Sequence, residues 1–210
     1  MLRRMHGLQR GDTIIEVLFA VSVFSLIAVG AIMVMNQGIA TAQKALEITQ
    51  VRQQMDAQAE ALRYAHHSYV MSLGTGGGSE EWNKLRIKAG QAGSISPLEV
   101  TGNPQKCNDI PGRAFIMNAR RATVELDSNK QPKSISSSEA GYTPPPFAKV
   151  SYLDSQAIER VDGIWIEAQE HGGSGGVGYI DFHIRACWES PGAGPVITLG
   201  TIVRLYELAA

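Results

Sequence analysis

An apolar stretch near the N-terminus constrains this chain more than any other feature. Residues Ile14–Met35 form 22 consecutive positions with a single charged side chain, Glu16. An α-helix of this length extends about 33 Å, which is enough to cross the hydrocarbon core of a bilayer. The stretch therefore predicts a membrane-spanning helix over residues 12–36.

The charges around this stretch predict its orientation. Arg3, Arg4 and Arg10 precede it without any acid, and the next basic residue after it is Lys44. Basic residues that flank a membrane span remain on the cytoplasmic side. We therefore expect a basic leader, residues 1–11, inside the cell. The chain then crosses the cytoplasmic membrane once and places its C-terminal part outside.

The residues alone leave three interpretations of the N-terminus open. The first is a secretory signal cut after Ala42, since Ala40–Ala42 supplies an A-x-A cleavage pattern. Against it, the apolar stretch is longer than the roughly 7–15 residues usual for a signal core. The second is an uncut signal anchor, which explains neither Glu16 nor a glycine at the junction. The third is cleavage at that glycine, Gly11.

A short motif at this junction resembles that of a known family. Residues Gly11–Leu18 read Gly-Asp-Thr-Ile-Ile-Glu-Val-Leu. This resembles the cleavage and methylation motif of type IV prepilins and pseudopilins, which is Gly, usually Phe, then Thr-Leu-Ile-Glu-Val-Leu. The resemblance implies that a prepilin peptidase cuts between Gly11 and Asp12 and methylates the new N-terminus on Asp12. Asp12 stands where the family usually has Phe.

The resemblance also implies a role for Glu16. An unpaired charge in the hydrocarbon region costs several kcal/mol, so such a residue is expected to have a partner. In this family the partner is the α-amine of a neighbouring subunit's first residue, met as the filament assembles. Thr13 and Glu16 also fit a capping box, in which Glu16 accepts a backbone N–H. The two roles are compatible.

The function implied by the resemblance is structural. The chain is expected to be a minor pilin or pseudopilin of a type IV pilus or a related secretion system. Its partners would be other pilin subunits through the N-terminal helix, the prepilin peptidase and the inner-membrane assembly platform. It would move from the membrane to an extracellular filament or the cell surface. The alternative from another class is a signal-anchored cell-surface binding domain that does not assemble.

Apolar periodicity continues beyond the membrane stretch and predicts an amphipathic helix over residues 37–73. One stripe recurs at intervals of three and four residues: Ile48, Val51, Met55, Ala59, Leu62, Ala65 and Tyr69. The opposite side is predicted to be polar: Gln50, Gln53, Gln54, Asp56, Gln58 and Glu60. Such spacing is typical of a helix that packs one face on a core. We therefore expect one helix from Asp12 to about Ser72, where glycines begin.

The C-terminal part of the head, residues 74–210, predicts an antiparallel sheet over about 163–207. Residues 163–169, 179–188 and 196–205 have the pattern of three strands separated by glycine-rich turns. One face of the second strand is apolar: Ile180, Phe182, Ile184, Ala186 and Trp188. The fold class is therefore α+β, with a long helical spine packed on a sheet of about three to five strands.

The middle of the head has weaker patterns. Residues 80–89 predict a short helix, and residues 114–118 and 122–126 predict strands. Residues 132–146 are rich in Ser and Pro and predict a surface loop.

The two cysteines, Cys107 and Cys187, predict a disulfide. Neither belongs to a C-x-x-C pair, which disfavours zinc and thioredoxin-like chemistry. If the head is exported, a disulfide is the expected state, with two unrelated buried thiols as the alternative.

The remaining chemistry-bearing residues do not indicate an enzyme. His66 and His67 are adjacent and point to different helix faces, and neither they nor His171 and His183 show metal-ligand spacing. We therefore expect no metal, cofactor or catalytic residue. The net charge is −1, so charge does not indicate nucleic-acid binding.

Overall fold

Helix α1, Asp12–Met71, is 60 residues long in the computed structural model. The structure describes residues 12–90, 107, 110, 113–126, 147–172, 178–189 and 196–207. The junction between the chain's two compact units, Met1–Leu46 and Glu47–Ala210, lies within α1. No proline occurs before Pro97, so nothing in the sequence interrupts the helical hydrogen bonds over this length.

The C-terminal end of α1 closes with a residue in the left-handed conformation. Leu73 has φ of 50°, and its N–H donates to the carbonyl oxygen of Val70 at 3.1 Å. The N–H of Gly74 donates to the carbonyl oxygen of Tyr69 at 3.0 Å. This pair of bonds is a Schellman closure, which satisfies carbonyl groups that the ending helix leaves free. The helix therefore ends where the glycines predicted it.

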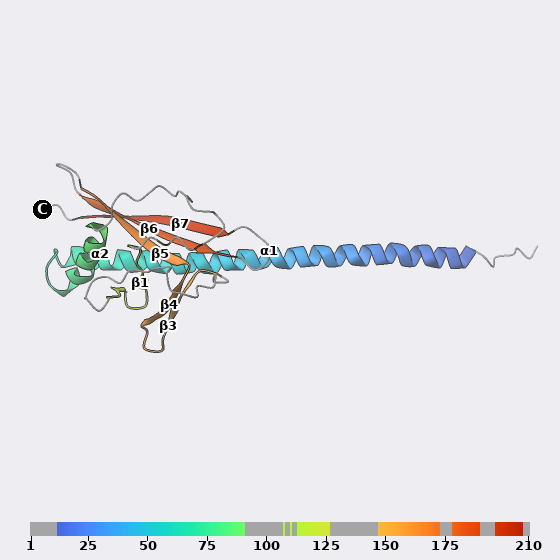
Figure 1. Ribbon diagram of the computed structural model, residues 1–210, viewed down its shortest axis with the longest axis horizontal. Helices are drawn as coiled ribbons and strands as arrows, with labels where there is room; N and C mark the ends of the chain where they lie inside the picture. Colours follow the sequence, from blue (N-terminus) through green and yellow to red (C-terminus); the bar gives the residue numbers. More distant parts are fainter. Residues whose placement is uncertain are drawn as a thin grey trace, which may run out of the picture. The chain divides into compact units, whose positions relative to one another are not determined.

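The main sheet of the second unit has three antiparallel strands. They are β5 (Ile164–His171), β6 (Tyr179–Trp188) and β7 (Ile197–Tyr206), in the order β5–β6–β7. Figure 1 shows them alongside the part of α1 that belongs to this unit. The three predicted strands are confirmed to within two residues at each end, and the α+β fold class is confirmed with them.

Smaller elements precede the main sheet. A 3-10 turn, η1 (Gly77–Ser79), leads into α2 (Glu80–Gly90), which confirms the predicted short helix. The two strands predicted next are much shorter, β1 (Met117–Asn118) and β2 (Thr123–Val124). The predicted loop at 132–146 and most of the glycine-rich turn at 172–178 lie outside the described residues.

A two-stranded hairpin that the sequence patterns do not predict follows. Strand β3 (Lys149–Tyr152) pairs with β4 (Ile158–Asp162), and the register shifts between Ser151 and Tyr152. Val150 is the one buried residue of β3, so the strand lacks the apolar alternation that marks a half-buried strand. The hairpin was therefore missed because its pairing is clear only in three dimensions.

The core of the second unit forms between α1 and the sheet. The predicted helical stripe is buried at Val51, Met55, Ala59, Leu62 and Ala65, and is partly buried at Ile48 and Tyr69. The predicted apolar face of β6 is buried in full and belongs to the same cluster. Burying one large aliphatic side chain stabilises the fold by about 1.5–3 kcal/mol, so this stripe holds α1 on the sheet.

Gln58 corrects the prediction for the polar side of the helix. The sequence pattern places it toward solvent, but its side chain is 1% exposed. Gln58 follows Met55 by three residues and precedes Leu62 by four, so it lies on the buried face. Its Nε2 donates to the carbonyl oxygen of Met117, and its Oε1 accepts from the Met117 N–H, each at 3.0 Å. The prediction followed side-chain polarity, whereas position on the helix decides burial.

Candidate membrane-anchoring segment

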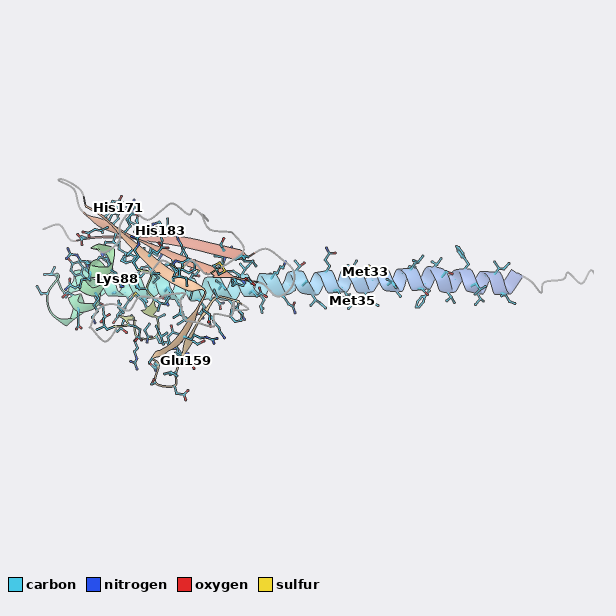
Figure 2. The ribbon with its side chains drawn as sticks, in the orientation of Figure 1. Met33, Met35, Lys88, Glu159, His171 and His183 are labelled. Atoms are coloured by element: carbon cyan, nitrogen blue, oxygen red, sulfur yellow. A yellow bond between two sulfur atoms is a disulfide. The ribbon has the colours of Figure 1, made fainter. Side chains whose placement is uncertain are left out.

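The unit Met1–Leu46 carries a helix with exposed apolar side chains. From Ile14 to Leu46, every large apolar side chain is exposed, from 39% at Val23 to 75% at Leu26. Figure 2 shows Met33 and Met35 among these side chains, directed away from the helix axis. Soluble monomers rarely expose a contiguous apolar surface of this kind. This surface is therefore suited to an apolar environment.

By length and composition, α1 is the helix in the described part of the chain that can cross a membrane. The core helix of a soluble protein can meet the same criteria, but such a helix is mostly buried. Here no part of the most apolar window is buried. The coarse prediction of an N-terminal helix suited to a membrane is therefore supported by both its composition and its exposure.

Polar side chains within this segment bond to the helix itself. The hydroxyl of Ser22 donates to the carbonyl oxygen of Leu18 at 2.5 Å, and that of Ser25 donates to Val21 at 2.7 Å. A hydroxyl in hydrocarbon has no water to bond, so such internal bonds are what a lipid-facing helix needs. The two serines are thus compatible with a membrane environment.

Glu16 lies on the exposed surface of α1 near its beginning. Among the described residues, no group forms a hydrogen bond or ion pair with the Glu16 carboxylate. The capping-box role of Thr13 and Glu16 stays a prediction, because the side chain of Thr13 lies outside the described part of the chain. Gly11 lies outside the described residues, and Asp12 is the first residue of α1.

The predicted disulfide joins Cys107 and Cys187, which are 80 residues apart. The Cα atoms are 5.5 Å apart, and both residues are buried in a small cluster with Ala114 and Trp165. The bond links Cys107 to the face of β6 opposite the main core. Disulfides persist in oxidising compartments, so the bond agrees with an exported head.

An ion pair occupies this same face of the sheet near the glycine-rich turn. Arg204 Nε donates to Asp181 Oδ1 and Arg204 Nη2 donates to Asp181 Oδ2, each at 2.8 Å. The guanidinium also lies over the Tyr179 ring, 4.1 Å from its centroid, and His171 Nε2 is 3.5 Å from Asp181 Oδ2. The hydrogen bonds from Arg204 lower the pKa of the Asp181 carboxyl. The carboxylate is therefore held charged and paired.

A second polar group continues along the face. Glu167 Oε1 accepts from Trp165 Nε1 at 3.0 Å and lies 3.1 Å from Arg185 Nη1. His183 is opposite Glu167 in the register, and both labelled histidines lie on this sheet in Figure 2. Burial lowers the pKa of His183, and the charge of Arg185 lowers it further. These contacts pair charges across strands, which is a structural role.

The histidines are not arranged for metal binding in the described residues. No group of three or more His, Cys, Asp or Glu side chains there could hold a metal ion. His66 Nε2 is 2.7 Å from the carbonyl oxygen of Tyr206, so it links α1 to β7. The side chain of His67 is exposed, and among the described residues it makes no contact of this kind with β7.

The sequence reasoning missed one contact at the start of the second unit. Glu47 is 8% exposed, and its Oε2 accepts from Trp188 Nε1 at 3.3 Å. The signal was present, because Glu47 precedes Val51 by four residues and so lies on the apolar stripe. An acid at such a position indicates a buried carboxylate with a donor in the sheet.

Comparisons with known proteins add no relative. No protein-family model, curated protein sequence or solved structure matches the chain.

Proposed function

We propose that this chain is a membrane-anchored subunit of a type IV pilus or related pseudopilus, in the manner of a minor pilin. It is cut after Gly11, retained in the membrane and then assembled through its N-terminal helix. The observation that carries the proposal is the Gly11–Leu18 motif, which resembles the prepilin cleavage motif and leads into the apolar stretch. The continuity of α1 supports it. Exposed apolar residues up to Leu46 continue without a break into the buried stripe that begins at Val51.

A helix of this kind can serve two apolar environments in turn. In the membrane, lipid covers the exposed side chains from Ile14 to Met35. In a filament, the same side chains pack on the helices of other subunits, so no second apolar surface is needed. The head, held by its own core and its disulfide, keeps its structure in both settings.

Glu16 gives the assembly step its driving force and register. An acidic side chain in a membrane helix is unfavourable, by up to about 2.5–3.5 kcal/mol at the helix centre on insertion scales, so pairing of Glu16 near the end of the span is favoured. Cleavage after Gly11 creates an α-amine on Asp12, and this amine on a neighbouring subunit can pair with Glu16. The pairing neutralises both charges and favours one axial offset between adjacent helices.

The alternative is a signal-anchored surface domain that never assembles. The exposed helix supports anchoring equally well in that case, so the two differ in processing and in assembly. Export as a soluble protein cut after Ala42 is less compatible, because Ala40–Ala42 lies inside the uninterrupted α1.

Mass spectrometry of the mature N-terminus distinguishes these possibilities. The full chain is produced in membranes with and without a prepilin peptidase. A start at Asp12 that depends on the peptidase is the expected result. An intact Met1 would identify an anchor, and a start at Gln43 would identify a soluble protein. Gly11→Val serves as the matched variant and is expected to remain uncut, because a branched side chain obstructs the scissile bond.

Assembly is tested separately through the charge. Glu16→Ala is expected to leave cleavage intact and to reduce incorporation into filaments at least tenfold. Glu60→Ala is the matched control, since it removes an exposed carboxylate from the same helix outside the apolar segment. Incorporation of Glu16→Ala at the wild-type level would disprove the pairing role of Glu16 and leave the anchoring role standing.

A further inference from the structure

Two acidic residues stand at the start of helix α1 in the unit Met1–Leu46. Asp12 is the first residue of the helix, and Glu16 follows it by four positions. Residues four apart are neighbours on one face of an α-helix, with Cβ atoms about 5–6 Å apart. No lysine or arginine occurs between Asp12 and Lys44, so this stretch of sequence supplies no positive side chain to compensate the two acids.

Cleavage after Gly11, which this inference takes from the proposed function, leaves the charges at the helix start unequal. It removes the three arginines with the leader and creates one α-amine on Asp12. One positive charge then stands against two carboxylates, those of Asp12 and Glu16. With an uncharged first residue, the amine and the Glu16 carboxylate would balance. Asp12 is therefore the residue that leaves the mature helix start with an excess negative charge.

A second copy of this chain is a poor neighbour for Glu16. The α-amine that Glu16 would meet belongs to Asp12 of that copy, so a second carboxylate lies on the same residue as the amine. The contact would bring two carboxylates to one amine. Like charges repel strongly where water and salt screen them little, and a charge without a counter-charge is unfavourable in an apolar environment. Pairing of identical copies thus leaves one carboxylate uncompensated at each contact.

A subunit with an uncharged first residue is the better neighbour. Its α-amine carries one positive charge and the Glu16 carboxylate one negative charge, so the contact is neutral. Glu16 is exposed on α1, and no group in the described part of the chain forms a hydrogen bond or ion pair with its carboxylate. Glu16 is therefore the half of the contact that this chain supplies, whereas its own amine is already compensated by Asp12.

We propose that Asp12 determines which neighbour this chain accepts in an assembly. Glu16 binds the α-amine of a different subunit, one with an uncharged first residue, in preference to the α-amine of a second copy. The chain therefore enters an assembly beside other subunits rather than in rows of its own kind. Asp12 is a specificity-determining residue that acts through the amine it carries.

Energy transfer between labelled copies in lipid vesicles measures this preference. The full chain is produced with a prepilin peptidase, and mass spectrometry checks the start at Asp12. Copies with a donor or an acceptor fluorophore fused after Ala210 are reconstituted into phosphatidylcholine vesicles. Asp12→Asn keeps the side-chain size and removes the charge, and it is expected to associate with itself at least tenfold more strongly than wild type. Asp56→Asn, at an exposed acid of α1 in the second unit, is the matched control and is expected to associate like wild type.

Mixed pairs show which copy supplies each half of the contact. The Asp12→Asn copy represents a subunit with an uncharged first residue, and wild type is expected to bind it at least tenfold better than it binds wild type. Glu16→Gln in the wild-type partner is expected to abolish this gain, because it removes the carboxylate that meets the amine. Glu16→Gln in the Asp12→Asn partner is expected to retain the gain. A general decrease in repulsion would instead make the two arrangements equal.

Three results would overturn the inference. They are equal self-association of wild type and Asp12→Asn, equal effects of Glu16→Gln in the two partners of the mixed pair, and a gain from Asp12→Asn that persists in the uncut Gly11→Val chain, which has no α-amine at Asp12. A purified chain that keeps Met1 would overturn the proposed function together with this inference. A chain that starts at Asp12 and gives any of the three results would overturn this inference alone.

Discussion

The buried amide of Gln58 offers the sharpest test of how α1 is held on the head. Gln58→Ala removes the side-chain amide that bonds to both the C=O and the N–H group of Met117. Met117 is fully buried, so no water can replace the lost bonds without opening the core. The substitution therefore leaves one N–H and one C=O group without partners.

The size of the effect follows from these two groups. A buried backbone donor or acceptor left without a partner costs about 1–3 kcal/mol. Two such groups set the expected loss in the free energy of unfolding at about 4 kcal/mol, within a range of about 2–6 kcal/mol. That loss corresponds to roughly a thousandfold increase in the unfolding constant. The cavity left by the shortened side chain acts in the same direction.

Urea denaturation of the full chain in detergent micelles measures this loss. The chain's three tryptophans, Trp82, Trp165 and Trp188, all lie in the second unit, so their fluorescence reports on the head. Gln53→Ala is the matched control, because Gln53 lies on the exposed side of the same helix. It is expected to change stability by no more than about 0.5 kcal/mol.

Gln58→Glu separates the hydrogen bonds from side-chain volume. The carboxyl group that this substitution introduces cannot donate to the Met117 carbonyl oxygen when it is ionised, whereas the protonated group can. The variant is therefore expected to regain stability relative to wild type as the pH is lowered. A loss below about 1 kcal/mol for Gln58→Ala, or equal losses for Gln58→Ala and Gln53→Ala, would refute the reasoning.

Two further predictions use the same denaturation assay. Replacing Cys107 and Cys187 by serine is expected to lower the free energy of unfolding by about 4.5 kcal/mol, since the bond closes an 80-residue loop. Reduced wild-type protein should be as stable as this variant. A variant as stable as oxidised wild-type protein would contradict the prediction. His183→Gln is expected to reduce the acid sensitivity of the head. Because burial and Arg185 lower the pKa of His183, the unfolded chain binds this proton more readily, so wild-type stability is full above about pH 6.5 and falls as the pH decreases toward the folded-state pKa. A variant that loses stability as steeply as wild type between about pH 6.5 and 5 would argue against this role.

Most of the fold could be predicted because its main elements have strong local periodicity. The stripe from Val51 to Ala65 repeats at helical spacing, and the apolar face of β6 alternates at every second residue. The β3–β4 hairpin has neither pattern, since its register shifts after Ser151. Its place in the fold depends on contacts such as the Asn118 side chain, which donates to the carbonyl oxygen of Gln156 at 2.8 Å.

The candidate anchoring segment could also be predicted, because it is defined by composition. A run of 22 mostly apolar positions with one acid needs no tertiary information to indicate a membrane helix. The disulfide was predicted from the expected compartment. The structure adds that Cys107 and Cys187 bond on the face of the sheet opposite the main core.

What the sequence determined by itself is the set of elements whose signal is local: the apolar helix, its amphipathic continuation and the three strands of the main sheet. The tertiary structure alone decided the roles of single residues. Gln58 and Glu47 are polar in sequence but buried in the fold, because each lies on the apolar stripe and meets a complementary group from a distant segment.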